Sequence, residues 1–200
     1  MTEQADWRHK LAERLTTPAA MVLAKTGITP NALTVIGFLV SAAAGALIAR
    51  EYFLAGGLVV LFAGAFDLLD GPVGRATGKT SKFGGFLDST LDRLSEAVVL
   101  AGIVAYYTFV EKATWEPLLA YGCFAGSVMV SYLRARAEGL GIKCEVGIFT
   151  RAERVIFMSA GLVFGQWFDL AIPIMLGIIT ALAFVTVAQR LIHVRRNDTR

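Results

Sequence analysis

The sequence predicts an all-α, polytopic membrane protein in which six transmembrane helices follow an amphipathic helix at the membrane interface. The chain has 200 residues, of which 56% are hydrophobic, 18% are charged and 20 are glycine. A soluble domain carries about 25% charged residues. Because one helical crossing of the hydrocarbon core takes roughly 20 apolar residues, the chain has room for at most about six spans.

The N-terminal segment has the pattern of a helix that lies on a membrane surface. Trp7, Leu11 and Leu15 recur at helical spacing, opposite basic residues at positions 8, 10 and 14. We therefore expect residues 1–28 to form a cytoplasmic interfacial helix.

Six apolar segments follow this helix. Thr29 and Pro30 supply an N-cap and a first-turn proline for the first span, 32–49, which contains no charged residue. The other predicted spans are 53–69, 83–109, 117–133, 155–168 and 170–189. Because several of them are short, the charged ends of the second, third and fifth are expected to continue as helix. Residues 29–194 then form one six-helix domain, and 195–200 a cytoplasmic tail.

The basic residues predict the orientation of the chain in the cell membrane. All lysines and arginines except Arg50 and Lys112 fall on the side that holds both termini. Because short cytoplasmic loops carry the positive excess, both termini and the loops beside them are expected to be cytoplasmic. The opposite side collects an aromatic belt of Trp115, Trp167, Tyr106 and Tyr107.

Charge and cysteine content exclude two other classes of function. The net charge of +3 follows from these topological signals, and no basic–aromatic alternation of the nucleic-acid-binding kind is visible. We therefore expect the lipid bilayer as a partner and no nucleic acid. Cys123 and Cys144 have no neighbouring Cys or His cluster, which predicts two unpaired structural thiols and no zinc or redox centre.

Four carboxylates lie at the ends of the second and third spans. Asp67 and Asp70 are three residues apart, and Asp88 and Asp92 are four apart, so each pair is expected on one helix face of an antiparallel hairpin. Carboxylates at membrane depth are costly unless they are paired or bind metal. Four oxygen donors without histidine or thiolate favour Mg²⁺ or Mn²⁺. Two divalent ions match this number of ligands and would bridge a diphosphate, which predicts phosphoryl transfer.

Small residues and one arginine surround the carboxylates. Gly71 and Gly74 remove side chains where a phosphate can approach the backbone, and Gly84 lies one turn before Asp88. Arg75 follows on the cytoplasmic side, where a guanidinium can hold a phosphate with two hydrogen bonds.

The spacing of these residues resembles the signature of the CDP-alcohol phosphotransferase family, D-x2-D-G-x2-A-R-x8-G-x3-D-x3-D. The chain matches this signature at Asp67, Asp70, Gly71, Arg75, Gly84, Asp88 and Asp92. It departs once, with Gly74 where the family usually has alanine. By this resemblance Asp67, Asp70 and Asp88 bind metal, and Asp92 is the general base that also touches the second ion.

The resemblance also implies the donor and the assembly. The acceptor hydroxyl attacks the lipid-side phosphorus of a CDP-lipid, and CMP leaves. The residues expected to bind the CDP-lipid are Asn31, Ala32, Leu33, Thr34, Gly71, Gly74, Arg75 and Ser81. Members of the family are expected to form homodimers.

The acceptor is expected to carry a phosphate of its own. Ser131 and Arg134 share one helix face, as do Arg151 and Arg154, and Arg190 lies just inside the final span, so helix ends can form a phosphate cradle. The segments 131–138 and 151–154 resemble those of bacterial phosphatidylinositol-phosphate synthases. That resemblance implies inositol phosphate as the acceptor, bound by Ser131, Arg134, Arg154 and Arg190.

Other interpretations stay open at this point. Glycerol 3-phosphate suits the same cradle, as in a phosphatidylglycerophosphate synthase, and a membrane prenyltransferase or a carboxylate-based transporter also uses intramembrane acids. The aspartates can instead be ion-paired with Arg75 and Arg93, and the cradle arginines can be topological signals alone. We interpret Arg93 and Glu96 as a supporting pair, and the glycines at 56–57 and 122–126 as sites of close helix packing.

Overall fold

The computed structural model describes residues 21–23, 25 and 27–197. Their helices are α2 (Pro30–Ile48), α3 (Phe53–Asp67), α4 (Asp70–Thr77), α5 (Lys82–Ala105), a π-helical turn η1 (Tyr106–Val110), α6 (Glu116–Gly139), α7 (Arg151–Gly165) and α8 (Ala171–Asn197). These residues form no strand, so the all-α prediction is confirmed. The predicted interfacial helix at 1–28 lies almost wholly outside the described residues.

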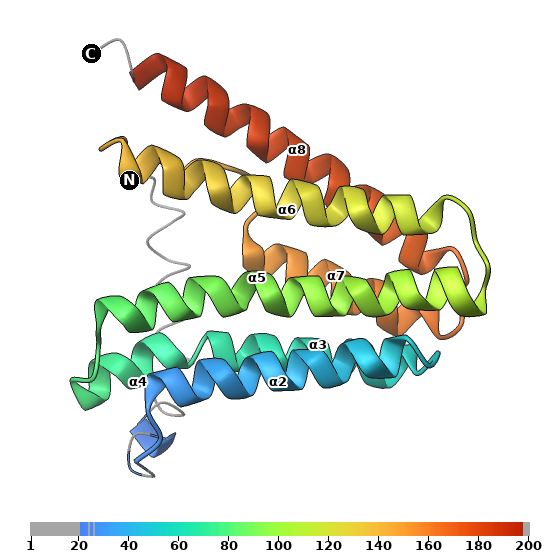
Figure 1. The fold of residues 1–200 in the computed structure, drawn as a ribbon, viewed down its shortest axis with the longest axis horizontal. Coiled ribbons are helices and arrows are strands. Elements are labelled where there is room, and N and C mark those ends of the chain that lie inside the picture. The colour runs from blue at the N-terminus through green and yellow to red at the C-terminus, as the bar shows by residue number, and fades with distance from the viewer. Residues whose placement is uncertain (1–20, 24, 26, 198–200) are drawn as a thin grey trace.

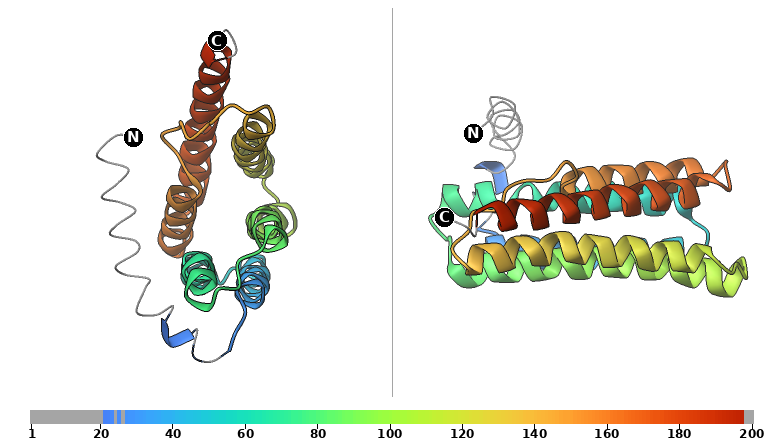
Figure 2. Two further views of the ribbon diagram at one scale, coloured as in Figure 1. Left: turned by 90° about the vertical axis from the view of Figure 1, so that its left-hand side faces the viewer. Right: turned by 90° about the horizontal axis from the view of Figure 1, so that it is seen from above.

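The six long helices close into a ring. Each packs against two others, in the order α2, α3, α7, α8, α6, α5 and back to α2. Figure 1 shows their long axes running across the molecule, and Figure 2 shows the arrangement from one end and from above. The short helix α4 packs on the start of α2 and the end of α3. The ring therefore brings the first turn of α7 toward α3.

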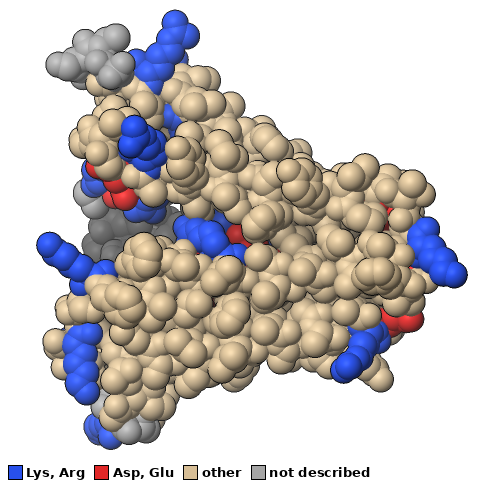
Figure 3. Space-filling view, in the orientation of Figure 1, with Lys and Arg blue, Asp and Glu red and all other residues tan. Residues whose placement is uncertain are grey.

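The helices are apolar enough for a multi-pass membrane protein. Five stretches meet the length and composition of a membrane span: Pro30–Ile48, Phe53–Thr77, Lys82–Val110, Glu116–Gly139 and Ala171–Asn197. The remaining predicted crossing, the fifth along the chain, is α7, whose 15 residues extend over roughly 23 Å and are shorter than a hydrocarbon core about 30 Å thick. Figure 3 shows a mainly uncharged surface, with basic side chains gathered at the left of the view.

Several helix boundaries differ from the prediction. α3 ends at Asp67 and a short helix, α4, begins at Asp70, so two residues interrupt the second predicted span. Both aspartates still lie against α2, Asp67 beside Gly37 and Asp70 beside Thr34. α4 ends at Gly78, whose φ of 66° is a left-handed conformation that suits glycine. α8 continues to Asn197, so part of the expected tail is helical.

Glycines set the closest helix contacts. Gly45 on α2 faces Gly102 on α5, and a Cβ on either would overlap backbone atoms of the opposite helix. A Cβ on Gly57 would lie 3.0 Å from the Ser159 carbonyl oxygen on α7, and one on Gly126 would lie 3.0 Å from Ala183 on α8. The interpretation of the 56–57 and 122–126 glycines as packing sites agrees with these contacts.

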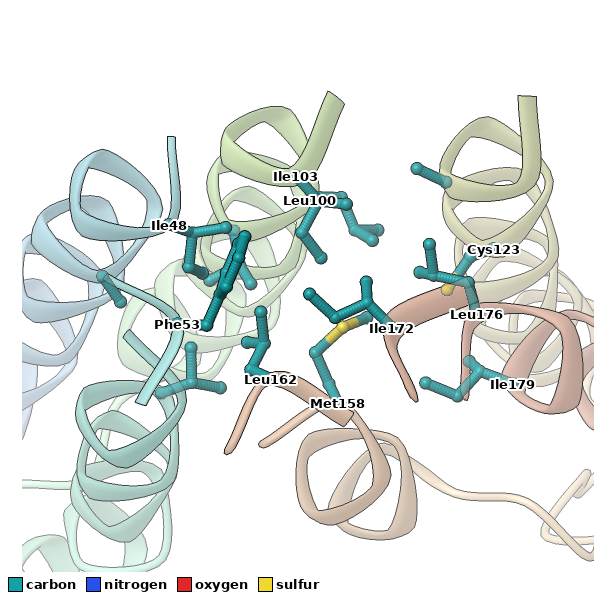
Figure 4. Packing of buried hydrophobic residues seen from close by; sticks show 14 of the residues in the cluster. Ile48, Phe53, Leu100, Ile103, Cys123, Met158, Leu162, Ile172, Leu176 and Ile179 are labelled. Atoms are coloured by element: carbon teal, nitrogen blue, oxygen red, sulfur yellow. The ribbon is translucent and has the colours of Figure 1, made fainter. Parts of the chain in front are cut away.

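The hydrophobic core lies inside the ring. Figure 4 shows Ile48, Leu100, Leu162, Ile172 and other side chains from α2, α3, α5, α6, α7 and α8 meeting there. Cys123 belongs to this cluster, and both cysteines are buried and free, as predicted.

The local signals at helix starts and at the aromatic belt were partly correct. The Thr29 hydroxyl accepts a hydrogen bond from the Ala32 backbone N–H at 3.2 Å, which confirms the predicted cap. Trp115 and Trp167 are more than half exposed, as a belt requires, but Tyr107 is buried. Tyr107 is therefore a core residue, because the π-helical turn directs it into the ring.

Candidate active site

The candidate active site is built from helix ends. Asp67 is the last residue of α3, Asp70 is the first of α4, and Asp88 and Asp92 lie in the first turns of α5. The start of α2 and the start of α7 complete it. Figure 3 shows acidic atoms beside basic side chains in a recess between the upper and lower helices.

Asp67 and Asp92 converge on one arginine. Arg151 Nη2 donates to Asp67 Oδ2 at 2.6 Å, and Arg151 Nη1 lies 2.7 Å from Asp92 Oδ1. These aspartates come from two different helices and their side chains are 15% and 11% exposed. α3 and α5 both pack against α2 and do not pack closely on each other as the predicted hairpin would, so Arg151 of α7 bridges these two predicted metal ligands.

The second oxygen of Asp92 is also paired. Arg93 Nη1 donates to Asp92 Oδ2 at 3.2 Å, while the Asp92 Oδ1 contact to Arg151 is close but not aligned as a hydrogen bond. Arg93 therefore serves Asp92, whereas Glu96 binds Arg154. In the described part of the chain Arg93 and Glu96 interact electrostatically but form no direct ion pair, because Arg154 bonds both oxygens of Glu96.

Asp70 is hydrogen-bonded to α2. Its Oδ2 accepts a hydrogen bond from the Thr34 hydroxyl at 3.1 Å, and its Oδ1 accepts one from the Gly71 backbone N–H at 2.6 Å. The side chain is almost fully buried. Asp67 Oδ1 lies beside Gly37, about one turn along α2 from Thr34, so both aspartates lie against the same helix.

The four carboxylates lie in two groups connected by Asp88. Asp88 interacts electrostatically with Asp67, with Asp70 and with Asp92. Among the described residues, no three Asp, Glu, His or Cys side chains are close enough as they stand to hold a metal ion. The donor set nevertheless fits one: hard carboxylate oxygens face a shared space, and two of them already converge on a cation, the Arg151 guanidinium.

A pocket of about 200 Å³ lies next to Asp70 and Asp88. It is lined by Pro30, Asn31, Thr34, Asp70, Gly71, Gly74, Lys79, Thr80, Ser81, Gly84, Gly85 and Asp88. Five of the residues predicted to bind the CDP-lipid are therefore brought together here. Ala32, Leu33 and Arg75 are not in its lining, and Leu33 is buried against Val73.

The walls of this pocket depend on small residues and a cap. A Cβ on Gly84 would lie 2.9 Å from Asn31 Oδ1, and one on Gly74 would lie 3.2 Å from Thr80 Cγ2. Ser81 is the N-cap of α5, and its hydroxyl accepts the Gly84 N–H at 2.9 Å. The glycine that replaces the family's alanine at position 74 therefore leaves room for Thr80 to approach α4.

A second, smaller pocket lies deeper in the ring. Its volume is about 40 Å³, enough for a few water molecules. Asp67, Asp92, Glu96, Arg151 and Arg154 are among its lining residues. The pocket therefore connects the aspartates with the buried arginine of α7.

Arg154 and Glu96 form a buried ion pair across the ring. Arg154 Nε and Nη2 donate to the two Glu96 oxygens at 2.9 and 3.3 Å, and the arginine side chain is 4% exposed. The guanidinium is thus held in a fixed plane beside the inner pocket.

The remaining predicted acceptor residues have partners of their own. Arg190 donates to the carbonyls of Val130 and Val146, so it fixes the α6–α7 connection. Arg134 pairs with Glu138 at 2.8 Å on the exposed face of α6. Arg134, Arg154 and Arg190 are close enough to interact electrostatically. They do not share a pocket with half-buried Ser131 in the described part of the chain.

Sequence reasoning missed the direct contact of Arg151 with the aspartates. It placed Arg151 only beside Arg154 in a phosphate cradle. The one signal was the spacing of these two arginines, which puts both on the face of α7 that enters the ring. Which carboxylates they meet depends on how α7 packs.

A helical membrane protein with a pocket beside inward-facing aspartates has the features of an enzyme that transfers phosphate-linked groups at the membrane. The family model for CDP-alcohol phosphatidyltransferases matches residues 27–190. The chain therefore belongs to this family and is an enzyme of its class. Enzymes of the family use divalent metal ions.

Named relatives and solved structures are similar along most of the chain. An archaetidylinositol phosphate synthase of Methanothermobacter thermautotrophicus is 44% identical over 81% of this chain and 80% of its own length. A phosphatidylinositol phosphate synthase of Mycobacteroides abscessus is 34% identical over 91% of this chain and 84% of its own. The crystal structure of the Mycobacterium tuberculosis phosphatidylinositol phosphate synthase with CDP-DAG bound matches with a TM-score of 0.83 and 31% identity. That match covers 90% of this chain and 94% of the other.

A further crystal structure of the M. tuberculosis enzyme is a complex with manganese and citrate. It matches this chain with a TM-score of 0.81 and 31% identity, over 90% of this chain and 88% of the other.

Proposed function

We propose that this protein transfers the lipid phosphate group of CDP-diacylglycerol, or of a similar CDP-lipid, to a hydroxyl of inositol phosphate. The products are phosphatidylinositol phosphate, or its counterpart with other lipid tails, and CMP. The proposal rests on two similarities that agree. The chain is similar to relatives named as inositol phosphate lipid synthases, and its fold matches a structure that has CDP-DAG bound.

The proposed reaction is a displacement at the lipid-side phosphorus of the donor. The acceptor oxygen forms a bond to this phosphorus, the phosphorus–oxygen bond to CMP breaks, and CMP leaves with the bonding electrons. Asp92 accepts the hydroxyl proton. Asp67, Asp70, Asp88 and Asp92 would hold two Mg²⁺ ions, or Mn²⁺, which neutralise the diphosphate and the developing charge.

The proposed donor site is the 200 Å³ pocket. Asn31, Thr34, Gly71, Gly74 and Ser81 are its proposed contacts with the CDP group, since they share that lining. Thr34 would also orient Asp70 through their hydrogen bond. Ala32, Leu33 and Arg75 are proposed contacts by family resemblance.

The proposed acceptor site uses Ser131, Arg134, Arg154 and Arg190. Their support is the electrostatic proximity of the three arginines and the position of Arg154 beside the inner pocket. Arg154 would hold the acceptor phosphate with Glu96 fixing the plane of its guanidinium.

The proposed setting is a homodimer in the cell membrane, with both termini and the active site cytoplasmic. The distribution of lysine and arginine supports this orientation. We keep 1–28, 29–194 and 195–200 as the proposed interfacial, catalytic and tail segments. Chemical cross-linking of the purified enzyme would test the dimer.

The substrate assignment is tested with two acceptors. Purified enzyme receives CDP-diacylglycerol and either inositol phosphate or glycerol 3-phosphate, and CMP release is followed with mass spectrometry of the product lipid. We expect turnover with inositol phosphate, and a preference for glycerol 3-phosphate would reject the acceptor. Asp92→Asn should abolish CMP release and leave binding of the donor largely intact, because the proton acceptor is lost while Asp67, Asp70 and Asp88 remain as metal ligands.

A further inference from the structure

Arg151 occupies the space between two aspartates that the proposed reaction needs. It is the first residue of α7, whose start is fixed by the capping box of Thr150 and Glu153. Its two terminal nitrogens lie 2.6 Å from Asp67 Oδ2 and 2.7 Å from Asp92 Oδ1. One guanidinium therefore bridges α3 and α5.

These contacts engage both oxygens of Asp92. Oδ1 faces Arg151 and Oδ2 faces Arg93. A carboxylate oxygen that is in contact with a guanidinium group is not available to a metal ion. Asp92 can therefore bind a metal ion through Oδ1 only after Arg151 withdraws.

The geometry indicates that a metal ion can replace Arg151 at Asp92. The contact to Asp92 Oδ1 is close but not aligned as a hydrogen bond, so it is mainly Coulombic. The Arg151 side chain is 26% exposed, whereas that of Arg154 in the same helix is 4% exposed. A group bound by charge attraction and partly open to solvent is replaced more easily than a buried, doubly hydrogen-bonded one.

Arg151 also has space into which it can move. It lines the inner pocket of about 40 Å³, together with Asp67 and Asp92. It lines as well a groove of about 430 Å³ between α3 and α7, which contains Asp67. The guanidinium can therefore leave the aspartates by rotation of its side chain, without movement of α7.

We propose that Arg151 is an internal cation that competes with the divalent metal for Asp67 and Asp92, so that metal loading displaces it. A guanidinium and a divalent ion repel each other when they share the same two carboxylates. Arg151 is thus a positioning residue: it keeps the two acids together until the metal binds. This inference rests on the proposed function.

Metal affinity tests the inference without reference to turnover. Mn²⁺ binding to the purified, lipid-reconstituted enzyme is measured by electron paramagnetic resonance for wild type, Arg151→Gln and the matched control Arg93→Gln. The control removes one positive charge beside Asp92 but leaves the Arg151 bridge between Asp67 and Asp92 in place. We expect Arg151→Gln to bind Mn²⁺ about tenfold more tightly, and Arg93→Gln to change the affinity by less than about threefold.

Thermal unfolding provides the second measurement. With a chelator present, Arg151→Gln should unfold at a lower temperature than wild type, because two carboxylates then repel each other. Saturating Mn²⁺ should remove that difference, since ligand binding stabilises the folded state. Arg151→Lys keeps the charge without the two-pronged contact and should give an intermediate Mn²⁺ affinity.

The outcomes separate the inference from the proposed function. Unchanged or weaker Mn²⁺ binding by Arg151→Gln, or an equal gain in Arg93→Gln, would overturn the competition. The function would stand in that case. If the wild-type enzyme bound no Mn²⁺ and turned over without divalent ions, both the inference and the metal assignment would fall.

Discussion

Loss of either partner of the buried ion pair between Glu96 and Arg154 should lower the free energy of unfolding substantially. Removing one partner of a buried ion pair costs about 3–5 kcal/mol, because the other charge stays buried and unpaired. Glu96 is 18% exposed, so water compensates part of this cost. We expect Glu96→Gln to lose about 2–3 kcal/mol, which corresponds to a fall of roughly 5–10 °C in the unfolding midpoint.

A double-mutant cycle measures the pair itself. Arg154→Met should cost as much as Glu96→Gln, whereas the double variant should cost clearly less than the sum, with a coupling of about 2 kcal/mol. A thiol-reactive fluorophore can follow unfolding in detergent, because Cys123 and Cys144 are free and buried until the helices separate. Single-variant losses that add within about 0.5 kcal/mol would refute a coupled pair.

Three other predictions concern the site and the helix packing. Thr34→Val should weaken Mn²⁺ affinity about tenfold, because the hydrogen bond that orients Asp70 is lost. Thr34→Ser keeps the hydroxyl and should keep the wild-type affinity. Equal losses of affinity in both variants would argue against this role of Thr34. Arg134→Gln should raise KM for the acceptor about tenfold or more, as expected for a lost hydrogen bond to a phosphate, and leave KM for the donor unchanged. The exposed Arg136→Gln is its control, and a similar KM in both variants would contradict the assignment. Gly102→Ala should destabilise the protein by about 1–3 kcal/mol, because the new Cβ overlaps the α2 backbone. Gly177→Ala, with open space around it, should be neutral or stabilising in the same thermal assay, and equal stability of the two variants would refute the packing argument.

The sequence alone determined the class of fold and the chemistry at the helix ends. Hydrophobic stretches of membrane length, the cap at Thr29 and the glycines between helices are local signals, because each depends on neighbouring residues or on one helix face. The acidic residues at 67, 70, 88 and 92 could be identified as a site from their membrane depth and spacing.

Tertiary structure decided how those residues are paired. Arg151 reaches Asp67 across 84 positions of the chain, and Arg154 reaches Glu96 across 58. Such contacts follow from the order of helices around the ring and from the rotation of each helix about its axis, neither of which periodicity specifies. The hydrogen bond between Asp70 and Thr34, 36 positions apart, depends in the same way on how α4 packs on the start of α2, because spacing within one helix does not specify which neighbouring helix a side chain meets.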